Sequence, residues 1–131
     1  MSQENVELVA ASLRDFQATL RATEAAAPDF VWDVSALEGW PDASQYFGPE
    51  GFNEFIAKWT EAYDEFEQNV EEVIDAGDQD VVSILSQRAR PRGSGSWVHL
   101  RFAVIWTVRE GKLTRGRVFR TAEEALAAAG L

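Results

Sequence analysis

The sequence of 131 residues contains no cysteine. Without cysteine the chain has no disulfide framework, no thiolate zinc or iron–sulfur site and no cysteine nucleophile. Long apolar runs are also missing, since no stretch approaches the roughly 18 residues of a membrane-spanning helix. The first seven residues are polar and acidic, whereas a secretory signal is basic and then apolar. We therefore expect a cytoplasmic protein that carries out no thiol redox chemistry.

Basic residues are scarce as well, because 12 Lys and Arg stand against 22 Asp and Glu, which gives a formal charge of −10. Nucleic acids and anionic membranes bind clustered basic residues, so neither is an expected partner. The charge is unevenly divided, with a net of −16 over residues 1–80 and +6 over residues 81–131. The basic segment indicates either an anion-binding face or, more commonly, strands with outward Arg beside acidic helices.

Histidine occurs once, at His99. Metal sites need several converging N, O or S ligands, which a single His without any Cys does not supply. The sequence also has no Gly-rich phosphate loop and no Ser/His/Asp set. We therefore expect neither a metal nor a cofactor, and we expect His99 to point away from any active site.

What the sequence has in quantity is hydrophobic residues, at 46%, including eight Phe, five Trp and two Tyr. This composition supports a folded core and excludes a disordered acidic tail. A chain of this length can bury one stable core, whereas two halves would each be too small. Residues 1–131 are therefore expected to form a single domain.

Two segments have the apolar spacing of amphipathic helices. The first is Val6–Leu20, and Thr23–Ala27 is expected to add a further turn that Pro28 stops. The second begins at Pro49 and keeps helical spacing as far as Phe66. Between the two helices, residues 30–34 are aromatic and β-branched, which predicts a strand followed by a long loop.

From residue 67 onward the apolar period changes from helical to two. Four strands are expected, joined by short turns as an antiparallel meander, over residues 70–74, 81–90, 97–108 and 113–120. Thr121 and Glu124 have capping-box spacing, which predicts a terminal Ala-rich helix. Helices segregated from a curved sheet define an α+β fold. The predicted architecture is a cone-like, strongly curved antiparallel sheet that encloses a pocket, with the N-terminal helices packed in its concavity.

Six short segments at the predicted turns and strand ends can be compared with those of known families. They are Gln3–Glu7, Pro28–Asp33, Tyr46–Phe52, Ile74–Asp78, Arg109–Lys112 and Ala125–Leu131. Over nearly the whole chain these segments resemble the SnoaL-like proteins of the nuclear transport factor 2-like superfamily. The resemblance implies a cone-shaped α+β domain. Members include polyketide cyclases, ketosteroid isomerases, epoxide hydrolases, dehydratases and non-catalytic dimerisation modules, so the fold alone assigns no reaction.

The resemblance also implies a role for Asp33, which matches the general base of ketosteroid isomerases. A carboxylate held beside Trp32 and Trp40 would be partly desolvated, which raises its pKa toward the range useful for proton transfer. The alternative is a structural Asp that caps the following loop or pairs with an Arg. The positions that match the isomerases' oxyanion hole are Leu13 and Val104, which are apolar, so steroid-type isomerisation is not expected.

Alternation along the last strand places Gly116, Val118 and Arg120 on one face, which lines the cavity by analogy with the superfamily. Arg120 is therefore expected to meet Asp33 inside the cone or at its rim. The pair is either a structural ion pair, which is the more frequent outcome, or an anchor for an anionic or carbonyl-bearing ligand.

Alternation along the long strand separates two faces. The wholly apolar set is expected to face the cavity and core, and it comprises Val98, Leu100, Phe102, Val104, Trp106 and Val108. The opposite, mixed set contains Trp97, His99, Arg101 and Ile105. Exposed Trp and Ile beside Arg are typical of interfaces, so this face predicts a homodimer.

Aromatic residues are concentrated between the second helix and the sheet, where most belong to the core. The residues predicted to bind a ligand are Trp32, Trp40, Phe55, Trp59, Phe102, Trp106 and Arg120. A cone lined by rings and few polar groups suits a small, apolar or aromatic molecule. Any catalysis is expected to be cofactor-free acid–base chemistry centred on Asp33. The alternative function is a non-catalytic dimerisation or interaction module whose cone is filled by its own side chains.

Overall fold

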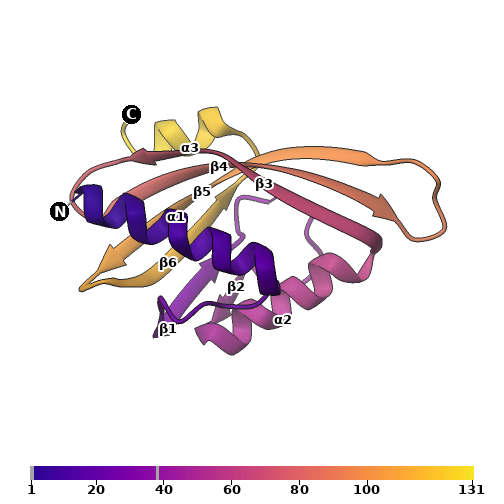
Figure 1. Cartoon of the computed structure of the whole chain (residues 1–131), viewed down its shortest axis with the longest axis horizontal. Coiled ribbons are helices and arrows are strands. Elements are labelled where there is room, and N and C mark those ends of the chain that lie inside the picture. The colour runs from indigo at the N-terminus through magenta and orange to yellow at the C-terminus, as the bar shows by residue number, and fades with distance from the viewer. Residues whose placement is uncertain (1, 38) are drawn as a thin grey trace.

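The computed structural model describes residues 2–37 and 39–131, which form three helices and six strands (Figure 1). In chain order the elements are α1 (Ser2–Thr19), β1 (Ala26–Asp33), β2 (Gln45–Phe47), α2 (Gly48–Glu61), β3 (Tyr63–Asp75), β4 (Asp80–Pro91), β5 (Val98–Arg109), β6 (Lys112–Phe119) and α3 (Ala122–Ala128). The predicted α+β class is confirmed. In the described part of the chain, no helix combines the length and apolarity that crossing a membrane requires.

The six strands form one sheet in the order β2-β1-β6-β5-β4-β3. The meander from β3 to β6 is antiparallel, as predicted. The prediction of a wholly antiparallel sheet is wrong, because β1 pairs with β6 in parallel, with Trp32 opposite Gly116. Turn signals between neighbouring strands predict hairpins only, so they carry no information about a pair that joins the two ends of the chain.

Two predicted helix boundaries are also wrong. The further helical turn expected over Thr23–Ala27 does not form, because Leu20 adopts φ 55° after α1 and Ala26 already pairs with Leu113 of β6. The Ala26 amide instead closes a single turn by donating to the Thr23 carbonyl at 3.1 Å. The second helix ends at Glu61, so Phe66 lies in β3 opposite Ala89 of β4. In both places pairing with a distant strand overrides the local helical spacing.

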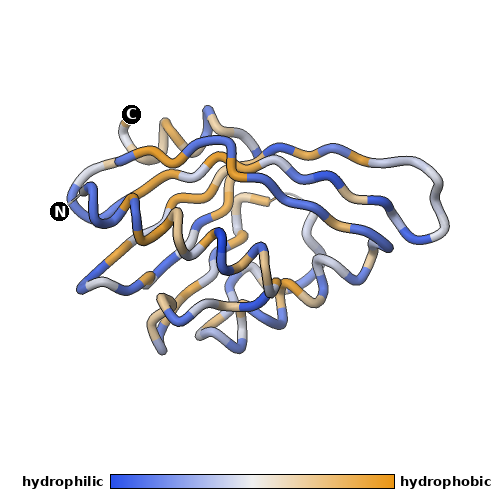
Figure 2. Tube along the Cα trace, in the orientation of Figure 1, coloured by the Kyte–Doolittle hydropathy of each residue, from blue (hydrophilic) through white to orange (hydrophobic). Residues whose placement is uncertain are grey.

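Each face of the sheet has its own hydrophobic cluster. α1 and α2 pack on the concave face, over a cluster to which all six strands contribute residues, including Tyr46 of β2. On the convex face, α3 packs over Val82, Ile84, Ala103 and Ile105. Figure 2 shows hydrophobic residues concentrated along the central strands, whereas hydrophilic residues are frequent in the helices and the β4–β5 hairpin. Thr121 caps α3 as predicted, because its Oγ1 accepts a hydrogen bond from the Glu124 amide at 3.0 Å.

Gly116 in the middle of β6 lies beneath two indole rings. A Cβ at this position would be 2.7 Å from Cε3 and Cζ3 of Trp32 and 3.2 Å from Cζ3 of Trp106. Both rings therefore lie directly against the β6 backbone, and they can do so only because residue 116 has no side chain.

We predict that Gly116→Ala lowers the free energy of unfolding by about 1–3 kcal/mol, because the added methyl group forces both rings to shift. Gly95→Ala is the matched control, since a Cβ at Gly95 meets open space. Denaturant titration followed by circular dichroism measures both variants. Equal stability of the two variants would contradict the proposed packing constraint.

Candidate functional site

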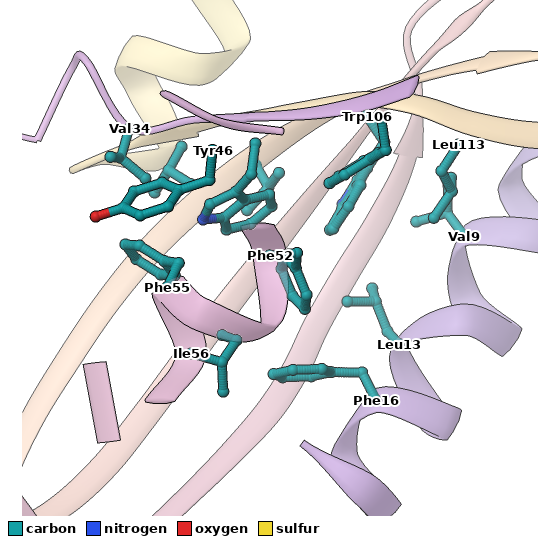
Figure 3. Close-up of a cluster of buried hydrophobic side chains, with 14 of the residues drawn as sticks. Val9, Leu13, Phe16, Val34, Tyr46, Phe52, Phe55, Ile56, Trp106 and Leu113 are labelled. Atoms are coloured by element: carbon teal, nitrogen blue, oxygen red, sulfur yellow. The ribbon is translucent and has the colours of Figure 1, made fainter. Parts of the chain in front are cut away.

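A cavity of about 400 Å³ lies between the concave face of the sheet and the helices α1 and α2. The sheet side, called here the cavity floor, includes Trp32 of β1, Trp106 of β5 and Val118 of β6. The helix side includes Leu13 of α1 and Phe55 of α2. Figure 3 shows side chains of the two helices converging beneath the sheet. The cavity is therefore enclosed by elements from both ends of the chain.

The spacing of apolar residues on α2 explains its contribution to the cavity. Phe52, Phe55, Ile56 and Trp59 recur at three- and four-residue intervals, so they share one face of the helix. All four line the cavity. Neighbouring rings are close, since Phe55 and Trp59 stack with centroids 5.7 Å apart and Trp40 lies 4.9 Å from Phe55. They form a continuous aromatic wall on the helix side.

Hydrogen bonds fix three of the indole rings around the cavity. Trp59 donates from Nε1 to Oε1 of Gln87 at 2.9 Å. Trp106 donates to Oγ of Ser83 at 2.9 Å, and Trp40 donates to the Tyr46 hydroxyl at 3.1 Å. Because the N–H groups are bonded to the protein, these residues present apolar surface to the cavity.

Trp32 differs from the other three indoles. Its Nε1 is buried and has no hydrogen-bond partner in residues 2–37 and 39–131. Its ring packs edge-to-face on Phe52 with centroids 4.9 Å apart. Because the nitrogen atom itself is enclosed by protein, we assign it no ligand contact.

The structure brings together on the cavity wall all seven residues predicted to bind a ligand. These residues are Trp32, Trp40, Phe55, Trp59, Phe102, Trp106 and Arg120. The alternation expected for β5 holds for Leu100, Phe102 and Trp106, which line the cavity, and for Val104, which belongs to the concave core. It does not hold throughout, because Val98 is exposed away from the cavity and Arg101 of the opposite set lines it. Contact of the seven residues with a ligand remains a prediction.

Asp33 lies outside this set. It follows Trp32 on β1, so its side chain points to the opposite, convex face of the sheet. There the carboxylate is 7% exposed and accepts a hydrogen bond from Arg115 Nη2 at 2.9 Å and one from the Ser35 amide at 2.9 Å. The predicted pair with Arg120 is wrong, because Arg120 belongs to the cavity side and lies 3.6 Å from Glu124.

The charge state of Asp33 also differs from the expectation. Burial raises the pKa of Asp33, but hydrogen bonds from Ser35, Arg115 and Gln45 together lower it more, so the pKa lies below its usual value. The predicted rise in pKa is therefore wrong. Asp33 is ionised at neutral pH and faces away from the cavity, which matches the structural alternative of a loop cap and ion-pair partner.

Only part of the mixed face of β5 is exposed to solvent. His99 is exposed on the convex side, as expected, and Trp97 lies under the guanidinium of Arg88, 4.1 Å from the ring centroid. Ile105 is fully buried beneath α3 with Ala122 and Ala125, so its predicted place at an interface is wrong. The terminal helix was expected, but local patterns did not indicate which face it covers. Within the described residues, no cluster of His, Asp or Glu is arranged to hold a metal ion.

Apart from Arg120, sequence patterns missed the polar residues of the cavity wall. Ser12, Arg21, Thr23 and Gln68 line it alongside the rings. Ser12 lies three residues after Val9 on the apolar stripe of α1, so its helical position could have identified it. Arg21 and Thr23 follow the helix in an irregular turn, where periodicity gives no signal.

The model of the SnoaL-like domain family matches residues 10–116. The chain belongs to this family. Solved structures of similar architecture include TerC co-crystallized with polyporic acid, with 20% identity, a TM-score of 0.74 and coverage of 98% of this chain and 99% of that chain. Bal32a from a soil-derived mobile gene cassette shows 18% identity and a TM-score of 0.73, over 89% of this chain and 88% of that chain.

A nuclear transport factor 2-like protein from Anabaena variabilis ATCC 29413 shows 17% identity and a TM-score of 0.71, over 91% of each chain. At these identities the likeness shows the fold, which is the cone-like fold of the nuclear transport factor 2-like superfamily. No protein of curated function matches the sequence.

Asp33 provides a pH-dependent test of the site geometry. Since its folded pKa is depressed, its contribution to stability is present above the unfolded pKa of about 3.9 and is lost as pH falls through the folded value. We predict that Asp33→Asn lowers the free energy of unfolding by about 1–2 kcal/mol at pH 7 and by less at about pH 3.

Denaturant titration at the two pH values measures this difference. Asp29→Asn is the matched control, because Asp29 is an exposed carboxylate on the same strand. A loss of stability for Asp33→Asn that is equally large at both pH values would contradict the ion-pair role.

Proposed function

We propose that this SnoaL-like domain binds a small, flat, mostly apolar or aromatic molecule in the cavity between the concave face and the helices α1 and α2. The observation that carries the proposal is the open volume of about 400 Å³ behind an aromatic wall. Small-molecule sites typically have volumes of about 300–1,000 Å³ and mostly hydrophobic linings. The seven predicted ligand-binding residues are the contacts that we propose.

The packing of the aromatic side chains supports ligand binding over the alternative function, which is a non-catalytic module whose cone is filled by its own side chains. A cone filled by its own rings would leave little volume, whereas here the rings of Trp40, Phe55 and Trp59 pack on one another along the wall. The hydrogen bonds that fix Trp40, Trp59 and Trp106 keep them in place without a ligand. A preformed site loses little conformational entropy on binding, which favours affinity.

The proposal is confined to binding and includes no reaction. Asp33 faces the other side of the sheet and has a lowered pKa, so it is not placed to move a proton inside the cavity. Among the described residues of the cavity wall, none is Asp, Glu, His, Cys, Lys or Tyr. Acid–base catalysis needs a group that titrates near the working pH, and Arg does not.

A matched pair of apolar residues on β5 tests the location of the site. Leu100 lines the cavity and is 41% exposed, whereas Val98 on the same face of the strand is 49% exposed and does not line it. We predict that Leu100→Glu weakens binding of an apolar ligand about tenfold, because it brings a charge beside the apolar wall, while Val98→Glu leaves binding unchanged.

The ligand for this test comes from a thermal-shift screen of naphthols, anthraquinones and related ring compounds against the wild type. A ligand present at 100 times its dissociation constant stabilises the folded state by about 2.7 kcal/mol, which is readily measured. Calorimetric titration of the two Glu variants with the best compound completes the test. If no ring compound stabilises the wild type, the proposed function is wrong.

The homodimer and the cytoplasmic location remain part of the proposal. The convex face of β3–β5 supports the homodimer, because it carries the exposed His99 and the ring of Trp97 away from α3. We predict that the wild type sediments as a dimer and that Trp97→Glu shifts it toward monomer, since a self-complementary interface would bury two unpaired charges. A monomeric wild type at high concentration in analytical ultracentrifugation would contradict the dimer.

A further inference from the structure

Three polar residues of the cavity wall lie on α1 or in the turn that follows it. Arg21 and Thr23 lie in this turn, Ser12 lies on α1, and all three line the cavity. The hydroxyl groups of Ser12 and Thr23 are hydrogen-bonded to each other at 2.7 Å. This part of the wall differs chemically from the aromatic wall built by α2.

The turn is held in a defined position. Leu20 has φ 55°, which redirects the chain after α1. The amide of Ala22 donates to Oδ1 of Asn53 on α2 at 2.7 Å, and the amide of Arg21 donates to Oγ1 of Thr19 at 3.2 Å. These contacts anchor the backbone of Arg21 between α1 and α2, so its side chain starts from a fixed point on the cavity wall.

The hydroxyl pair has a hydrogen-bond donor to spare. One hydroxyl donates to the other, and neither makes a second hydrogen bond to a described residue. Either hydroxyl can be the donor in this bond, so one hydroxyl hydrogen is left without an acceptor among the described residues. Ser12 is 8% exposed and Thr23 is half-buried. A donor that is largely shielded from water gains from a hydrogen-bond acceptor, so an acceptor atom supplied by a bound molecule would be stabilising here.

The charged residues of the wall have one sign. The described lining residues include Arg21, Arg101 and Arg120 but no Asp or Glu, in a chain whose formal charge is −10. Arg101 is bonded to Glu71 at 3.0 Å and Arg120 lies 3.6 Å from Glu124. Arg21 makes no ion pair within residues 2–37 and 39–131, so its charge is available to a ligand.

We propose that Arg21 and the Ser12–Thr23 hydroxyl pair form an anion-binding end of the cavity, which takes the carboxylate of an aromatic acid whose rings lie against the aromatic wall. The guanidinium group donates two parallel hydrogen bonds to a carboxylate, and the spare hydroxyl donates a third. This inference rests on the proposed binding function and adds the charge of the ligand to it.

The test compares two probes of nearly the same shape, 2-naphthoate and 2-naphthamide, by isothermal titration calorimetry on the full chain. The expected result is that 2-naphthoate binds about tenfold more tightly than 2-naphthamide at low salt, because charge-assisted hydrogen bonds are stronger than neutral ones. Added salt should reduce this preference, since Arg21 is exposed and its charge is screened.

Three variants assign the preference to residues. Arg21→Gln should abolish the preference for 2-naphthoate while the affinity for 2-naphthamide stays the same. Ser12→Ala should reduce the preference in part. Arg14→Gln is the matched control, because Arg14 is an exposed Arg on α1 that does not line the cavity, and it should leave the preference unchanged.

The outcomes separate this inference from the function on which it rests. If both probes bind equally well, or if Arg21→Gln keeps the full preference, the anion-binding end is wrong and the aromatic cavity stands. If neither probe binds although a ring compound from the thermal-shift screen does, the anion-binding end is wrong and the binding function stands; if no ring compound binds at all, both proposals are wrong. A preference that Arg14→Gln removes as completely as Arg21→Gln reflects the general charge of α1, and it would also overturn the assignment.

Discussion

The contact between two indole rings and the bare backbone of Gly116 determines the shape of the candidate site. Trp32 and Trp106 lie against this glycine, so the two rings that form the cavity floor are in direct contact with the backbone of β6. The parallel pairing of β1 with β6 brings Trp32 opposite Gly116, and the antiparallel pairing of β5 with β6 brings Trp106 to the same place. The remaining space between this floor and the helices is the volume that a ligand would occupy.

Trp32 and Asp33, which are neighbours on β1, lie on opposite faces of the sheet and make different kinds of contact. Trp32 belongs to the cavity floor, whereas Asp33 on the convex side is bonded to Arg115 of β6. The ion pair joins the end of β1 to β6 at the same level at which Trp32 packs on Gly116. A charged contact outside the cavity thus supports an apolar contact inside it. This gives Asp33 a structural role that does not involve catalysis.

Local patterns were sufficient for much of the fold and for the aromatic part of the site. Alternation along β5 predicted most of its cavity-facing residues, and helical spacing predicted Phe55 and Trp59, because each depends on one element alone. The partner of Asp33 depends on the register of β1 against β6, which no local pattern encodes, so Arg120 was predicted in place of Arg115. Arg21 was missed for a related reason, since its position depends on the contact of its turn with Asn53.

The pairing of β1 with β6 also determines when the cavity can form during synthesis. β1 leaves the ribosome well before β6, because β2, α2, β3, β4 and β5 lie between them in the chain. Until β6 has emerged, the apolar faces of α1, β1 and α2 have no complete sheet to cover, and non-local strand pairs of this kind form slowly. The nascent chain therefore exposes these aromatic residues until β6 has been made, and a chain truncated before β6 retains the rings of the site without the floor on which they pack.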